Sequence, residues 1–173
     1  MAMLSSMTRR DLEAQSYPPL VFILAPLVAI GLQSLVALHF ERFNILDLPL
    51  MVTIFFGLAR REPITATLYG SLVGIGQDAL THLPIGVFGI TNALIGFLAA
   101  SLGVKIDVEN HGTRLLLNFP FMLLHSLIFW IIARHMLATN LTWNWSRELI
   151  RAVANSIVAV ILFALLDRTR VRD

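Results

Sequence analysis

Residues 64–104 read ITATLYGSLVGIGQDALTHLPIGVFGITNALIGFLAASLGV, and this stretch decides the class of fold. It contains two apolar runs, 64–81 and 86–104, joined by a short link that includes Pro84. Each run approaches the roughly 20 helical residues needed to cross the hydrocarbon layer of a membrane. Because the link is so short, we expect the two runs to form antiparallel neighbouring helices.

The same pattern continues on both sides of this stretch. Hydrophobic residues make up 57% of the 173 and charged residues 14%, compared with about 45–50% and 25% in soluble domains. The runs are apolar on all sides rather than alternating, which favours helices over strands of a β-barrel. We therefore predict an all-α integral membrane protein, a six-transmembrane-helix bundle forming a single domain over residues 1–173. The predicted spans are 19–38, 45–59, 64–81, 86–104, 115–136 and 148–166.

Two of these runs need further comment. The second covers only about 20 Å of helix, so it must meet thinned bilayer, borrow flanking residues or be shielded by protein. The first is longer than the 7–15 apolar residues of a signal peptide. We therefore interpret the first run as a span.

The distribution of basic residues predicts an orientation. If the N-terminus is cytoplasmic, nine basic residues lie on that side and four on the other. Under the positive-inside rule, this asymmetry between short loops predicts that both termini are cytoplasmic. The cytoplasmic set is Arg9, Arg10, Arg60, Arg61, Lys105, Arg114, Arg168, Arg170 and Arg172, and the opposite set is Arg42, Arg134, Arg147 and Arg151. The net charge of +2 is too small to suggest nucleic-acid binding.

Small residues recur at helical spacing in the third and fourth runs. Such spacing lets helix backbones approach closely in lipid, where packing drives association. We predict that, as a set, these residues form the tightly packed centre, although any single glycine is better explained by the abundance of glycine in membrane helices. The predicted packing residues are Gly70, Gly74, Gly89, Ala93, Gly96 and Ala100.

Asp78 lies inside an apolar run, where a carboxylate costs a few kcal/mol or more. It must be satisfied by neighbours such as Asn92 or Asn155, or face an outward cavity. In the predicted orientation, the outer halves of the spans also hold Gln33, and His125 lies near the middle of the fifth. We predict a candidate functional polar cluster of Asp78, Gln33, Asn92, His125 and Asn155.

Three interpretations of this cluster stay open: hydrogen bonding between helices, a ligand pocket, and a proton or ion path. A path is disfavoured because the inner half of the layer has almost no titratable groups. No catalytic constellation or phosphate-binding glycine loop occurs, and the chain has no cysteine. The histidines show no paired ligand spacing, so we expect no enzyme activity, no cofactor and no metal. The five histidines are His39, His82, His111, His125 and His135.

One set of residues extends from the second run into the fourth: Gly57, Arg61, Pro63, Gly70, Gly74, Asp78, Ala79, Leu83-Pro84-Ile85-Gly86 and Gly89. This set resembles the central region of the rod-shape-determining MreD family. The length of about 170 residues, the short second run and the basic C-terminal tail are similar too. The motif covers Gly57 to Gly96, and the apolar pattern covers nearly the whole chain.

The resemblance implies a non-catalytic, multi-pass subunit of the bacterial inner (cytoplasmic) membrane. Its implied role is in cell elongation, in lateral peptidoglycan synthesis and the maintenance of rod shape. The implied partners are an MreC-like single-span membrane protein and, directly or through it, the RodA glycosyltransferase and a class B penicillin-binding protein.

The family's fold is similar to that of the substrate-binding subunits of energy-coupling-factor vitamin transporters, which supplies an alternative function. Fold likeness alone does not choose between the two. The predicted outer loops offer few aromatic and hydrogen-bonding residues for a vitamin, which favours the elongation subunit. The polar cluster favours the alternative.

Overall fold

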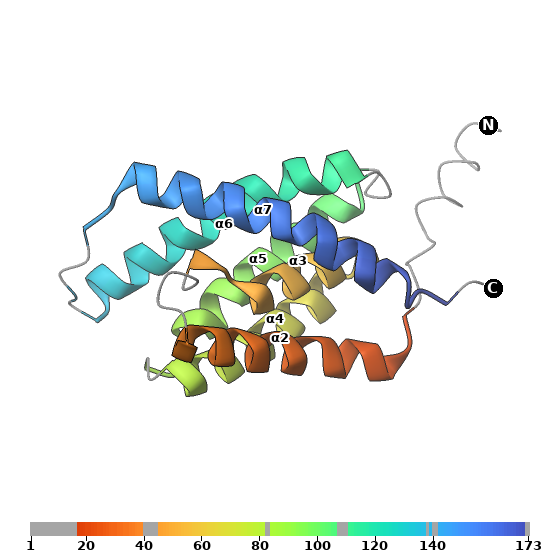
Figure 1. The fold of residues 1–173 in the computed structure, drawn as a ribbon, viewed down its shortest axis with the longest axis horizontal. Coiled ribbons are helices and arrows are strands. Elements are labelled where there is room, and N and C mark those ends of the chain that lie inside the picture. The colour runs from red at the N-terminus through yellow and green to blue at the C-terminus, as the bar shows by residue number, and fades with distance from the viewer. Residues whose placement is uncertain are drawn as a thin grey trace.

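Six α-helices make up most of the computed structural model, which describes residues 17–39, 45–81, 84–106, 111–137, 139 and 142–171, without the side chains of 36–39 and 111 (Figure 1). No strand occurs among these residues, so the all-α prediction is confirmed. Each helix coincides with one of the predicted apolar runs, with ends that differ by a few residues. The helices are α2 (Pro19–His39), α3 (Leu48–Arg60), α4 (Pro63–Thr81), α5 (Val87–Gly103), α6 (His111–His135) and α7 (Trp145–Asp167).

The short helix α3 lies at the centre of the bundle. It contacts all five of the other helices, and Figure 1 shows it between α6 and α7 on one side and α2 and α4 on the other. Every residue from 49 to 59 is buried. Of the three solutions open to a short apolar run, the structure therefore shows shielding by protein.

Local sequence explains where α3 begins and ends. Asp47 is its N-cap, with a side chain that accepts a hydrogen bond from the Leu50 amide at 3.3 Å, and Pro49 lies in the first turn. Both residue types are favoured at these positions. Arg61 ends the helix in the left-handed conformation, with φ of 58°. Helix α4 then starts at Pro63, so the two helices are joined by only two residues.

Polar and apolar side chains are distributed in an unusual way. Large apolar side chains are exposed along α2, α4, α5, α6 and α7, with values as high as 79% for Ile64. The interior instead holds many polar side chains, namely Asp47, Thr53, Gln77, Asp78, Thr91, Asn92, Arg114, Asn118, His125, Ser126, Asn155 and Ser156. Water would penalise such an exterior, whereas lipid would not.

By length and composition alone, fewer of the described helices qualify as candidates for crossing a membrane. Within the described part of the chain, α6 and α7 are both long and apolar enough to cross a membrane. Over their described side chains, α2, α3 and α5 are apolar but shorter.

Helices α4 and α5 form the most extensive contact between any two described helices. Their backbones nearly touch at three glycines. A Cβ atom would lie 2.3 Å from the Asn92 carbonyl oxygen at Gly70, 2.3 Å from the Phe88 oxygen at Gly74 and 2.5 Å from the Ala66 oxygen at Gly96. These distances are too short for any side chain.

The other predicted packing residues have different surroundings. A Cβ at Gly89 would meet the Ile75 side chain at 3.0 Å and backbone only at 3.6 Å, at the Ser71 carbonyl oxygen, and Ala93 is half-buried. Ala100 is fully buried but lies beside Gly57 of α3. Gly103 was not among the predicted packing residues, yet a Cβ atom there would lie 2.6 Å from the Leu58 carbonyl oxygen. The small residues of α5 therefore pack partly against α4 and partly against α3.

Adding one methyl group at the α4–α5 contact tests this packing. We expect Gly74→Ala and Gly96→Ala each to lower the free energy of unfolding by about 1–3 kcal/mol, because the backbones must separate. Thermal unfolding in detergent measures the change. The matched control is Gly31→Ala in α2, where a Cβ meets nothing within 4 Å. Helix propensity predicts a gain of up to about 1 kcal/mol there. Equal melting of all three variants would contradict the close approach.

Candidate functional site

The carboxylate of Asp47 is the centre of a buried polar cluster. Its side chain is fully buried at the start of α3. Besides the Leu50 amide, Oδ1 accepts a hydrogen bond from Gln77 Nε2 of α4 at 3.1 Å. Oδ2 lies 3.4 Å from Arg151 Nη2 of α7 and 3.9 Å from His125 Nδ1 of α6. One carboxylate therefore connects four helices.

Three amide side chains extend the cluster. Asn155 accepts from the Asp47 amide at 2.7 Å and donates to the Ile45 carbonyl oxygen at 2.8 Å. Gln33 of α2 accepts from the Leu48 amide at 2.8 Å. Asn92 of α5 donates to Gln77 Oε1 at 3.3 Å. We call these seven residues the Asp47 cluster: Gln33, Asp47, Gln77, Asn92, His125, Arg151 and Asn155.

The electrostatics of the Asp47 cluster are balanced. A buried carboxylate without a partner would cost several kcal/mol, and here Arg151 supplies the opposite charge. The amide groups at the start of α3 add the positive end of its helix dipole. Four hydrogen bonds of the cluster end on the backbone of 45–50, so its clearest effect is to hold the first turn of α3.

Three buried atoms near these bonds make no hydrogen bond in the described structure: His125 Nε2, Asn92 Oδ1 and Asn118 Oδ1. The His125 ring stacks on Phe88 with centroids 5.9 Å apart, and the Asn118 amide donates to Ser156 Oγ at 3.4 Å. These atoms retain the capacity to bind one more donor or acceptor inside the bundle.

Asp78 lies beside the cluster, but its side chain has a different structural role. Oδ1 accepts from the Phe88 amide at 2.9 Å, and Oδ2 accepts from the Gly86 and Gly89 amides at 2.8 and 3.2 Å. These groups form the start of α5, whose N-cap, Gly86, has no side chain and adopts a φ of 112°. The carboxylate of α4 therefore caps α5 across the connecting turn, where a negative charge is favoured.

The structure thus brings four of the five predicted residues together, with Asp78 as the exception. Its hydrogen-bond partners at the start of α5 are backbone amides instead of the Asn92 or Asn155 side chains favoured by the sequence. Asp47, Gln77 and Arg151 were not predicted to belong to the cluster. Asp47 lies near the start of the second predicted span, where an aspartate two residues before a proline signals a helix start.

A second charged group lies at the other end of α3. Arg114 of α6 is buried, pairs with Asp167 at the end of α7 and lies over the Phe55 ring. The Tyr17 hydroxyl donates to Asp167 at 3.2 Å. Burial, and then the negative charge of Asp167, raise the pKa of the Tyr17 phenol. Tyr17 is therefore a neutral donor at physiological pH.

Comparison of this chain with protein-family models, with curated proteins and with solved structures found no match. The residues and their geometry are therefore the basis for any functional proposal.

The capping role of Asp78 predicts a specific loss. Asparagine offers one acceptor oxygen and places an amide donor against backbone N–H groups. We expect Asp78→Asn to lower the free energy of unfolding by about 1–3 kcal/mol and to speed hydrogen exchange at the Phe88 and Gly89 amides. The control is Glu62→Gln, an exposed residue on the α3–α4 link. Unchanged stability and exchange in Asp78→Asn would refute the cap.

Asp47 should matter more than any other member of its cluster. We expect Asp47→Ala to cost about 3 kcal/mol, because Arg151 and the start of α3 lose their partner in the interior. The loss in the Asp47→Ala/Arg151→Ala double variant should be clearly less than the sum of the two single losses. Exposed Glu62→Ala should change stability by no more than about 0.5 kcal/mol. Additive losses would show that the two charges do not interact.

Proposed function

We propose that this chain is a multi-pass, non-enzymatic subunit of the bacterial inner membrane that acts in cell elongation and binds an MreC-like single-span partner. Through that partner, or directly, it joins the RodA glycosyltransferase and a class B penicillin-binding protein. The proposal combines the family resemblance with three features of the structure.

The first feature is the apolar exterior. Side chains such as Leu20, Leu72, Leu116 and Ile161 are more than 60% exposed on four different helices. Polar groups at the same depth point inward and bond to one another. This arrangement supports a bundle whose six helices are all embedded in lipid, with short α3 satisfied by its neighbours.

The second feature is the main support for the proposal. The residues that resemble the MreD family share a common physical role. Gly70 and Gly74 allow contact with α5, Asp78 caps α5, and Gly86 turns the chain into it. Arg61 ends α3 with positive φ. All of these positions define backbone geometry in the α3–α4–α5 unit. The shared motif is therefore one that specifies a fold and not a chemical site.

The third feature concerns orientation. Two of the basic residues counted in the sequence are engaged inside the bundle, Arg114 with Asp167 and Arg151 with Asp47. Without these two, eight basic residues remain on the predicted cytoplasmic side and three on the opposite side. The asymmetry still favours cytoplasmic N- and C-termini, which reporter fusions at the two ends would test.

One observation favours the second candidate, the substrate-binding subunit of a vitamin transporter. His125 Nε2 and two amide oxygens have unused hydrogen-bonding capacity, and binding sites use a few such convergent groups. Four hydrogen bonds of the Asp47 cluster, however, hold the backbone of 45–50 at the start of α3. That use is structural, and it places the elongation subunit first.

Co-purification separates the two candidates. A tagged chain is extracted from native membranes with mild detergent, and its bound proteins are identified by mass spectrometry. We expect a single-span MreC-like protein; a pair of ATPases would establish the transporter function instead. Another tagged multi-pass protein from the same membranes is the control. Recovery of neither partner above that control would count against the proposal.

A further inference from the structure

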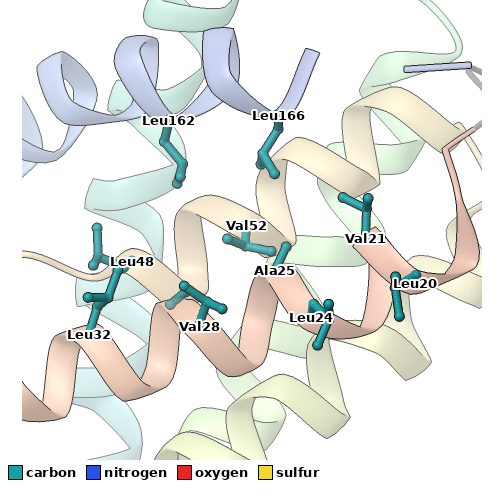
Figure 2. Close-up of a pocket in the computed structure, with 11 residues that line it drawn as sticks. Leu20, Val21, Leu24, Ala25, Val28, Leu32, Leu48, Val52, Leu162 and Leu166 are labelled. Carbon is teal, nitrogen blue, oxygen red and sulfur yellow. The ribbon is translucent and has the colours of Figure 1, made fainter. Parts of the chain in front are cut away.

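An apolar groove runs along the bundle between α2 and α7. These two helices do not contact each other among the described residues, so the flank of α3 forms the floor of the groove (Figure 2). Leu20, Leu24 and Val28 line the α2 wall, Leu162 and Leu166 line the α7 wall, and Val52 lies at the floor. All of the side chains that line it are apolar.

The length of the groove matches one leaflet of a membrane. On α2 it extends from Leu20 to Leu32, which is about 18 Å of helix. The hydrocarbon layer is about 30 Å thick, or about 15 Å per leaflet. A transmembrane helix from a partner would instead extend across both leaflets.

The volume of the groove is sufficient for part of a hydrocarbon chain. It is about 280 Å³, nearly twice that of an apolar cavity of about 150 Å³ that holds benzene. An acyl chain lying along the groove would contact apolar side chains only.

One end of the groove lies next to charged side chains. At one end, Leu20 and Leu166 lie beside the Tyr17–Asp167 hydrogen bond, where the carboxylate of Asp167 is already paired with Arg114. Exposed Arg168 follows directly after α7. A chain entering the groove from this end would place its headgroup at the end of α7 that carries Arg168. Basic side chains at a membrane surface attract anionic lipids.

We propose that the α2–α7 groove binds one acyl chain of an anionic phospholipid, with the phosphate at Arg168. The inference rests on the membrane embedding in the proposed function but needs no partner protein. Lipid tails are as apolar as leucine, so the groove alone gives little preference over bulk lipid. Arg168 therefore supplies the selectivity for the headgroup, and the groove supplies the position.

The test uses the purified full chain in non-ionic detergent and two lipids with the same chains, dioleoylphosphatidylglycerol and dioleoylphosphatidylcholine. Native mass spectrometry measures the lipid retained. We expect one phosphatidylglycerol per chain, held about fivefold more strongly than phosphatidylcholine. Arg168→Gln should lose this preference, as expected for one arginine at a charged surface, whereas Arg147→Gln at the other end of α7 should keep it.

Ala25→Phe and Val28→Phe fill the groove and should reduce retention of both lipids about fivefold or more. Val28 is 55% exposed, so this variant tests the groove even if Ala25→Phe fails to fold. The control is Leu72→Phe, on an exposed face of α4 outside the groove. Undiminished retention in Val28→Phe would overturn the groove as the site. Equal retention of the two lipids by the wild-type chain would overturn the assignment of the headgroup. Neither result depends on which protein co-purifies.

Discussion

The rest of this bundle depends on a negative charge held in its interior. Helix α3 is too short to reach both surfaces of a membrane, and its first turn begins with backbone amides that lipid cannot satisfy. Asp47 caps that turn, and the side chains that secure Asp47 come from α4, α6 and α7. The short helix is thus stable because its neighbours surround it. The same contacts fix the positions of those neighbours. Asp78 repeats this solution for α5, so two carboxylates stabilise the starts of two helices.

Much of the architecture was predictable because local patterns in the sequence indicate it. Apolar runs separated by charges and turns predicted the helical segments, and small residues at steps of three and four indicated the α4–α5 contact. Polar residues within apolar runs indicated most of the Asp47 cluster. These are signals of single segments, and each depends on the period of the helix.

The remaining features depend on how segments meet. Asp47 is 30 residues from Gln77 and 108 from Asn155, and a carboxylate at the edge of an apolar run resembles an ordinary flank. The partners of Asp78 are backbone amides, which have no signature in the sequence. The groove exists because α2 and α7 stay apart, and helix order alone does not specify that separation. In each case the missing information is how two or more helices are arranged in space.

The central position of α3 also has a consequence for biogenesis. The ribosome makes α3 second among the described helices, but Arg151 follows Asp47 by 104 residues and belongs to the last. At translation rates of about 5–20 residues per second, the carboxylate spends roughly 5–20 s without its cation. During that interval α3 can be kept beside α4 and α5 by the glycine contacts, which need no later segment. If α3 lies in the membrane as proposed, a nascent chain that stops before α7 would leave Asp47 in lipid without its cation, a state suited to recognition by quality-control proteases.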